Sequence, residues 1–167
     1  MHPHFELNYI IDANVLIDFC DSDLNILRLF STEIGSVHIG RSTFDKVDQL
    51  SESKANKHDL TIIAPSLSIA LEAGKKRGAL AYDDHETLLL AKEQGLTVIT
   101  NDKALRRECK KEGVQILWGL EPLKLLTEKA VISVKEACRI ATIIHKNNSF
   151  YISCEILARF VKQVKNL

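Results

Sequence analysis

The chain has 167 residues, which fits one compact domain with a modest appendage, and its 46% apolar residues suffice for a substantial core. The formal net charge is zero, which excludes a global basic field of the kind that attracts nucleic acid. The charge is uneven, however, because residues 129–167 carry seven Lys or Arg against two Glu. The remainder is acidic, so a polyanion bound there would need a metal ion or local basic patches.

The four cysteines are isolated, without a close pair of the kind that binds zinc. We expect free, buried thiols in a reduced, cytoplasmic protein. Residues 1–7 contain no apolar signal core, and no apolar run approaches the length of a membrane span. The sequence therefore predicts no association with a membrane.

Short apolar segments alternate with amphipathic segments up to residue 117. Each apolar segment predicts a buried strand and each amphipathic segment predicts a helix. The predicted strands are 8–11, 34–39, 60–64, 96–100 and 114–117, and the predicted helices are 13–19, 24–30, 43–50, 84–94 and 103–112. A further helix is predicted to be capped by Ser66 or Ser68 and to run to Lys76. The polar stretch 51–58 is predicted to be a loop. Strands separated by helices with short links are typical of a parallel sheet that is covered on both faces.

From Leu120 the pattern contains helices only. A helix is predicted to run from Pro122 to Glu128, and Ser133 opens a capping box that begins another. Ser153 is predicted to cap a final amphipathic helix. Two short amphipathic helices cannot bury their apolar faces alone. We therefore expect residues 129–167 to be a helical extension, packed on the domain of residues 1–128 or on a partner.

Carboxylates stand where predicted strands and helices meet. Asp12 follows the first strand and Asp102 follows the fourth. In open parallel sheets, ligands collect beyond the carboxyl ends of the strands, at the topological switch point. Asp84 begins the helix before the fourth strand, in line with Leu88 and Ala91, which predicts that it lies on the buried face. Together the three acids predict a site for a hard divalent cation, although each one alone is equally explained as a helix cap.

The sequence resembles the PIN (PilT N-terminus) domain family over residues 7–126. The resemblance is carried by IIDANVLID at 10–18, by Asp84 seven residues ahead of Ala91, and by TND at 100–102. It implies an α/β fold, a three-layer sandwich with a central parallel sheet, followed here by the C-terminal helices. It also implies a metal-dependent endoribonuclease that resembles toxins of the virulence-associated protein C type.

The resemblance further implies that Asp12, Asp84 and Asp102 bind Mg²⁺ or Mn²⁺ as catalytic ligands, where the ion activates water for attack on an RNA phosphodiester. The family usually has a further acid on the helix after the second strand. This chain departs from that pattern, since Lys46 stands near the expected place. Asp48 is the favoured substitute because helical spacing puts it at the rim of the buried face, whereas Asp45 faces solvent. Without either residue, the site has three acids.

Other polar residues near these acids have candidate roles. Asn14 and Thr100 match family positions that hydrogen-bond the acids or bound water, and Asp83 is a candidate outer group. Each is equally explained by local capping, hydrogen bonding at a strand end or a helix dipole. Arg106 and Arg107 follow Asp102 and are candidates for binding the RNA backbone, although charge on a solvated helix face also explains them.

Three further side chains are assigned by their position in the predicted helices and strands. His85 is expected to be solvated in the first turn of its helix. Glu86 is expected on the exposed side of the same helix. Trp118 ends a strand and is expected in the core rather than as a platform for stacking.

The sequence thus predicts a cytoplasmic endoribonuclease whose products carry a 5′-phosphate and a 3′-hydroxyl. The resemblance implies a toxin with a cognate antitoxin protein as its partner, and homodimers are common in that family. One alternative is a non-catalytic PIN-like module that binds RNA or protein, and another is a nuclease directed at DNA. An enzyme that cradles nucleotide phosphates is disfavoured because no Gly-rich loop follows the first strand.

Overall fold

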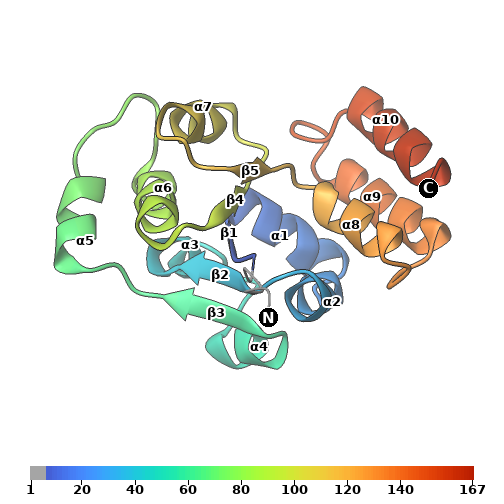
Figure 1. The fold of residues 1–167 in the computed structure, drawn as a ribbon, viewed down its shortest axis with the longest axis horizontal. Coiled ribbons are helices and arrows are strands. Elements are labelled where there is room, and N and C mark those ends of the chain that lie inside the picture. Colours follow the sequence, from blue (N-terminus) through green and yellow to red (C-terminus); the bar gives the residue numbers. More distant parts are fainter. Residues whose placement is uncertain (1–6) are drawn as a thin grey trace, which may run out of the picture.

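A parallel sheet runs through the centre of the computed structural model, which describes residues 7–167 (Figure 1). Its strands are β1 (Tyr9–Ile11), β2 (Val37–Gly40), β3 (Leu60–Ile63), β4 (Thr97–Ile99) and β5 (Ile116–Leu117). They lie in the order β3-β2-β1-β4-β5, and every neighbouring pair is parallel. This confirms the predicted α/β class and central parallel sheet. The chain moves outward from β1 in both directions, so the topological switch point lies between β1 and β4.

Helices cover both faces of the sheet, which confirms the three-layer arrangement. Successive strand residues point to opposite faces, so Ile11 and Ile99 lie in one apolar core whereas Ile10 and Val98 lie in the other. The first core is covered by α1 (Ala13–Ser22) and α2 (Asn25–Glu33), and by the C-terminal helices. The second is covered by α5 (Leu67–Ala73), α6 (Tyr82–Gln94) and α7 (Lys103–Lys111). Gly95 ends α6 with a φ of 68°, the left-handed conformation expected of a helix stop.

The segment after β2 differs from its prediction. Helix α3 (Arg41–Asp45) is shorter than the predicted 43–50. Val47 and Leu50 are still buried, but they are held by successive turns, in which the Val47 N–H donates to the Phe44 carbonyl and the Leu50 N–H to that of Val47. A spacing of three residues is compatible with such turns as well as with a helix, which explains the overestimated length.

The predicted loop at 51–58 contains a helix, α4 (Glu52–Lys57). Ser51 caps it, since its hydroxyl accepts a hydrogen bond of 3.2 Å from the Lys54 N–H. Only Ala55 of this helix is buried. A helix with a single inward residue has no apolar stripe, so its sequence looked like that of a polar loop.

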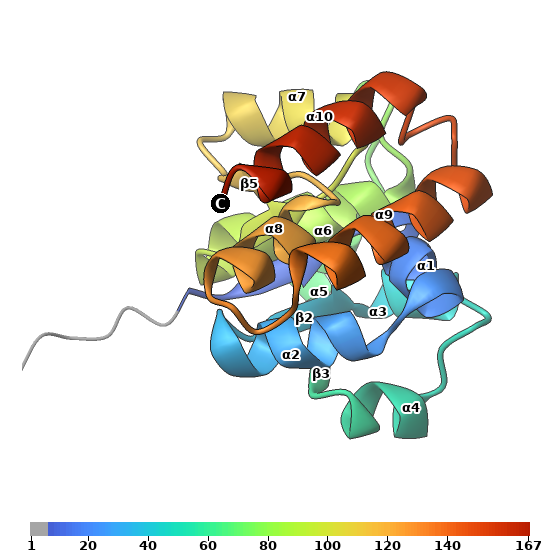
Figure 2. The ribbon, with the colours of Figure 1, turned by 90° about the vertical axis from the view of Figure 1, so that its right-hand side faces the viewer.

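The chain ends in α8 (Glu121–Glu128), α9 (Val134–Asn147) and α10 (Cys154–Lys165). Ser133 and Ser153 cap α9 and α10 as expected, through hydrogen bonds from the N–H groups of Glu136 and Ile156. Figure 2 shows the three helices side by side, with α9 next to α1. Ile140 of α9 lies in the same apolar core as the strand residues. The extension is therefore packed on the sheet domain.

No helix in residues 7–167 is both long enough and apolar enough to cross a bilayer. All four cysteines are free, but only Cys109 is buried, and Cys154 is exposed. The expectation about a signal core concerns residues 1–7, of which all but Leu7 lie outside the described residues.

Candidate metal centre

Asp12 leaves the sheet at the end of β1 and is buried, with 1% of its surface exposed. It caps α1, because its carboxylate accepts a hydrogen bond of 2.9 Å from the Val15 N–H and another from the Thr100 hydroxyl. Burial raises the pKa of Asp12 to about 6, although these two hydrogen bonds oppose the rise and the negative charge of Asp102 adds to it. The carboxylate is thus held rigidly at the switch point.

Asp102 lies at the end of the neighbouring strand β4 and caps α7. Its carboxylate accepts a hydrogen bond of 2.7 Å from the Leu105 N–H, and its own N–H donates to the Thr100 hydroxyl at 3.0 Å. The Thr100 hydroxyl therefore contacts both acids, since it donates to Asp12 and accepts from Asp102. The pairing of Ile11 with Ile99 across β1 and β4 sets this geometry.

Asp84 lies in the first turn of α6 and is half-buried. Burial raises its pKa to about 7, the charges of Asp83, Asp12 and Asp102 add to the rise, and the ammonium of Lys46 opposes it. Within residues 7–167 its carboxylate has no hydrogen bond or ion pair. The predicted ligands Asp12, Asp84 and Asp102 thus lie close enough to perturb one another, and Asp84 is the one whose charge no direct partner offsets.

A cation stands beside this acidic group. The ammonium of Lys46 forms an ion pair with the buried carboxylate of Asp83. Asp83 is therefore neutralised by a side chain from the turn after α3, and the same ammonium acts on Asp84 through space. The chain has a fixed positive charge near the place where the sequence resemblance led us to expect a further acid.

The candidates for that further acid lie at the surface. Asp48 is exposed in the turns after α3, beyond the end of the helix on which it was placed. Asp45 is exposed and pairs with Arg41 at 3.1 Å. Neither is among the leading influences on the pKa of Asp12 or Asp84. The described geometry therefore groups three acids and Lys46, with Asp48 and Asp45 outside the group.

The connection between α9 and α10 brings Tyr151 to the same place. The Asn14 side-chain amide donates a hydrogen bond of 3.3 Å to the Tyr151 hydroxyl. The pKa of Tyr151 is raised by partial burial and by the charges of Asp102, Asp12 and Asp84. Sequence reasoning missed Tyr151 because its closest partner, Asn14, is 137 residues away along the chain. No local pattern marks such a contact.

Two side chains of α6 that were expected to be exposed are buried. Glu86 is 1% exposed and accepts a hydrogen bond of 3.1 Å from the Ser42 N–H, and His85 is 3% exposed and contacts the Lys75 carbonyl through Nδ1 at 3.2 Å. The prediction was wrong because α6 lies beneath the sheet, with α3, α5 and α7 around it. The N-terminal turns of α6 are covered on several sides, so His85 and Glu86 are enclosed, whereas Lys92, Glu93 and Gln94 at its C-terminal end remain exposed.

The two arginines after Asp102 have different surroundings. Arg107 is paired with Glu108 at 3.4 Å. The guanidinium of Arg106 lies over the ring of Trp118, 3.8 Å from the ring centroid. Trp118 is 44% exposed, so its predicted place in the core was wrong. Strand β5 is an edge strand of two residues, and Trp118 follows it, where no further layer covers the indole.

The three acids fit a hard divalent ion in chemical type. Their donors are carboxylate oxygens, the ligands that Mg²⁺ and Mn²⁺ prefer. Burial raises the pKa of Asp12 and of Asp84, and the charges of neighbouring acids add to the rise, so a cation would relieve this repulsion. Among the described residues, no group of three or more Asp, Glu, His or Cys side chains is close enough together to hold a metal ion as the side chains stand.

Comparison with known proteins identifies the fold. No protein-family model matches the sequence, and no match is found among curated proteins. In three dimensions the chain is similar to a PilT N-terminus domain protein from the hyperthermophilic archaeon Sulfolobus solfataricus. The TM-score is 0.53 at 19% sequence identity, and the similarity covers 71% of this chain and 92% of the archaeal one. At this identity the likeness shows a shared fold.

Proposed function

Because the chain has the PIN-domain fold, we propose that it is a metal-dependent nuclease, and specifically an endoribonuclease that uses Mg²⁺ or Mn²⁺. One observation carries the proposal. The half-buried carboxylate of Asp84 has no direct partner in residues 7–167 and lies within electrostatic reach of Asp12 and Asp102. Three acids that repel one another at the switch point of a parallel sheet are stabilised by a hard cation.

The proposed roles follow from how each side chain is held. Asp12 and Asp102 are fixed by backbone N–H groups and by Thr100, so they would hold the ion in a defined position. Asp84 has both carboxylate oxygens available and would complete the set. The bound ion supplies an activated water and offsets the charge that develops on the phosphate. Arg106 lies on the helix that starts beside Asp102 and would bind the RNA backbone.

The biological setting is proposed from the sequence resemblance. The family that the sequence resembles includes many toxins of toxin–antitoxin pairs, so the proposed partner is a cognate antitoxin protein. Homodimerisation is part of the same proposal, as is action in the cytoplasm. The basic charge of residues 129–167 supports RNA as the substrate, since it offsets the acidic remainder of the chain.

The direct test is cleavage of total RNA by the full chain with Mn²⁺, with Mg²⁺ and with EDTA. Asp12→Asn, Asp84→Asn and Asp102→Asn are each expected to reduce the rate at least about a hundredfold, because each removes a ligand charge. The matched control is Asp21→Asn, which removes an exposed acid from the helix that Asp12 caps. Equal cleavage by all four variants, or undiminished cleavage in EDTA, contradicts the proposal. A DNA substrate in parallel distinguishes RNA specificity from general nuclease activity.

The pair of Lys46 and Asp83 favours a second candidate, a non-catalytic module that binds RNA or protein. A fixed ammonium beside Asp84 partly replaces the charge that an ion would bring, and so lowers the affinity for that ion. Calorimetric titration with Mn²⁺ separates the two functions. Measurable affinity that is lost in Asp84→Asn and increased in Lys46→Gln supports the nuclease. No Mn²⁺ binding by either the wild type or Lys46→Gln supports the module.

A further inference from the structure

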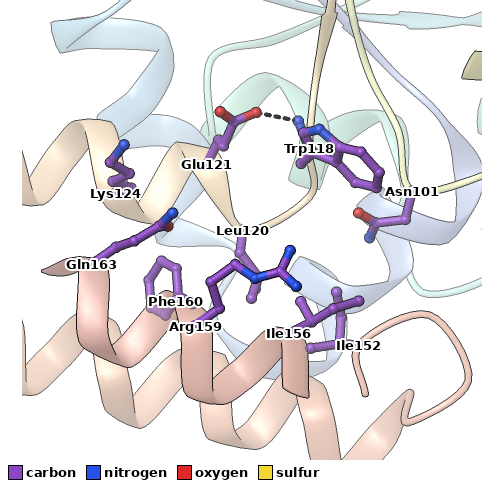
Figure 3. A pocket seen from close by; sticks show the side chains of 10 residues that line it. All are labelled: Asn101, Trp118, Leu120, Glu121, Lys124, Ile152, Ile156, Arg159, Phe160 and Gln163. Atoms are coloured by element: carbon purple, nitrogen blue, oxygen red, sulfur yellow. Dashed lines mark hydrogen bonds between the residues drawn. The ribbon is translucent and has the colours of Figure 1, made fainter. Parts of the chain in front are cut away.

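A cavity of about 340 Å³ lies between the sheet domain and the C-terminal helices. Figure 3 shows its walls, with Asn101 and Trp118 on one side and side chains of α10 on the other. This volume falls in the range of small-molecule sites. The three acids and Tyr151 are not part of its lining, so it is distinct from the metal centre.

The cavity has an apolar floor and an aromatic wall. Leu120, Ile152 and Phe160 are buried residues that line it. Trp118 adds an exposed indole, and the guanidinium of Arg106 lies 3.8 Å from its ring centroid. A flat, apolar ring is the kind of group that such walls accommodate, because stacking on an aromatic side chain requires only a π-face.

One polar group in the wall lacks a partner. Asn101 is 8% exposed, and its side chain points toward the cavity (Figure 3). Its carbonyl oxygen accepts a hydrogen bond of 2.9 Å from the Gly119 N–H, which sets the orientation of the amide. Its Nδ2 is buried and has no hydrogen-bond partner among the described residues. A buried donor without a partner is costly, so this group calls for an acceptor on a ligand.

The side of the cavity formed by α10 carries a positive charge. The guanidinium of Arg159 reaches across the cavity (Figure 3), and within residues 7–167 it makes no ion pair or hydrogen bond. Lys124 also lines the cavity, where its ammonium pairs with Glu128 at 3.6 Å. The one acid in the lining, Glu121, accepts a hydrogen bond of 2.5 Å from the Trp118 N–H. The cavity therefore combines a stacking wall, a buried donor and cations, which suits a nucleobase attached to phosphate.

Two residues of the cavity lining are sequence neighbours of residues at the metal centre. Asn101 in its wall immediately precedes Asp102, and Ile152 in its floor immediately follows Tyr151. Tyr151 hydrogen-bonds to Asn14 and feels the charges of all three acids. A strand of RNA whose phosphate lies at the acids would have a neighbouring base within reach of the cavity.

We propose that this cavity is a nucleobase subsite, which binds one base of the RNA next to the cleaved phosphate through Trp118, Asn101 and Arg159. The assignment rests on the proposed function for its substrate. It makes the helical extension a determinant of which RNA is bound. The Asn101 donor would favour bases that present an acceptor to it, and the aromatic wall would add affinity for any base.

Trp118 is the sole tryptophan, so its fluorescence reports directly on this cavity. The full chain is titrated in EDTA, where it does not cleave, with each of the four nucleoside 5′-monophosphates. Ribose 5-phosphate and inorganic phosphate are the matched ligands without a base. We expect saturable quenching by at least one nucleotide and none by ribose 5-phosphate. A single-stranded RNA decamer should compete with that nucleotide, and an abasic decamer of equal charge should not.

Two variants test the assigned contacts. Arg159→Ala changes an exposed residue and Asn101→Ala removes the buried donor, and each is expected to weaken nucleotide and RNA binding about tenfold. Arg139→Ala is the control, since it removes an equal charge from α9 at a residue paired with Glu136, outside the cavity. Thermal melting of each variant checks folding, and Arg159→Ala keeps the test valid if Asn101→Ala is destabilised.

The outcomes separate this inference from the nuclease proposal. Quenching by ribose 5-phosphate equal to that by nucleotides, or binding that Arg159→Ala leaves unchanged, overturns the subsite even if RNA is cleaved. Nucleotide binding with which the RNA decamer does not compete also overturns it, since the cavity would then hold a free nucleotide. Base-dependent binding that is weakened by both variants supports the subsite even if no RNA is cleaved.

Discussion

At the scale of single residues, the charge of Asp84 has the largest consequences. The carboxylates of Asp12 and Asp102 also cap helices, so their burial is partly offset by N–H donors. Asp84 has no such donor within the described chain, and its raised pKa of about 7 reflects burial together with three neighbouring acids. Burial and repulsion of this charge destabilise the folded chain when no metal ion is bound. Binding of a cation would remove that destabilisation, which is why this acid is central to the proposal.

The first prediction concerns the pH dependence of stability in metal-free protein. The pKa of Asp84 is about 7 in the folded chain and 3.8 when unperturbed, so the folded state binds the proton more tightly. The stability of the wild type should therefore fall as pH rises from about 4 to about 7. Asp84→Asn escapes this loss and should be more stable than the wild type at pH 8, by about 1–2 kcal/mol after allowance for partial exposure.

Urea unfolding in EDTA at pH 4.5 and pH 8 measures this difference, which should nearly vanish at the lower pH. Asp21→Asn, at an exposed site on α1, should show no such pH dependence. A gain in Asp84→Asn that is the same at both pH values would mean that the carboxylate is not strained by its surroundings.

At the scale of whole elements, the N-cap residues predicted the starts of helices most reliably. Ser133 and Ser153 begin α9 and α10, and both accept the expected N–H donors. Helix α4 was missed although Ser51 caps it, because a cap is recognised with confidence only when an apolar stripe follows. The apolar stripe of α10 ends in Phe160 and Val164, which lie in the main core.

The second prediction follows from this connection between cap and core. Ser153→Ala removes the side-chain acceptor for the Ile156 N–H and should lower the free energy of unfolding by about 1 kcal/mol. Because α10 shares the main core, the loss should appear in the global transition rather than as local fraying. Chemical denaturation measures it, with Ser149→Ala as the control at an exposed position in the preceding loop. A stability equal to that of the control would show that α10 opens independently.

At the scale of the whole molecule, the extension and the sheet domain share one core. Ala137, Ile140 and Ile144 of α9 are buried in the same cluster as Val15 and Phe19 of α1. The boundary predicted at residue 128 lies one helix beyond Leu120, where the pattern changes from alternating strands and helices to helices alone. The packing runs across that boundary without interruption, and the proposed subsite lies between the two parts.

The third prediction is that a chain truncated after Glu128 does not fold as the intact protein does. Removing residues 129–167 uncovers the apolar side of α1, and exposed apolar surface of this kind destabilises the folded state and promotes aggregation. We expect loss of a cooperative thermal transition, or a melting temperature lower by at least about 10 °C. Circular dichroism and dye binding measure this. A truncated chain that melts like the full one would establish residues 1–128 as an autonomous domain.

The sequence by itself determined the class of fold and the positions of the acids along it. The alternation of apolar and amphipathic segments, and glycines such as Gly95 that end helices, depend on local sequence. They can therefore be recognised without the structure. Asp12 and Asp102 were placed together because parallel strands end at one edge, a rule that needs only the predicted topology. These rules did not predict the side chains that surround the acids. Lys46 was noticed only through the family resemblance, and no local pattern in the sequence indicated Tyr151.

Only the tertiary structure decided which polar groups are buried and what stands beside the acids. Glu86 and His85 are enclosed because other helices surround α6, and Trp118 is exposed because β5 ends at the edge of the sheet. Tyr151 lies beside Asn14 because the connection between α9 and α10 returns to α1, and Asn101 shares a cavity with residues of α10. The burial of a side chain depends on contacts with residues that are distant in the sequence. Local periodicity does not predict which of those residues will pack against it.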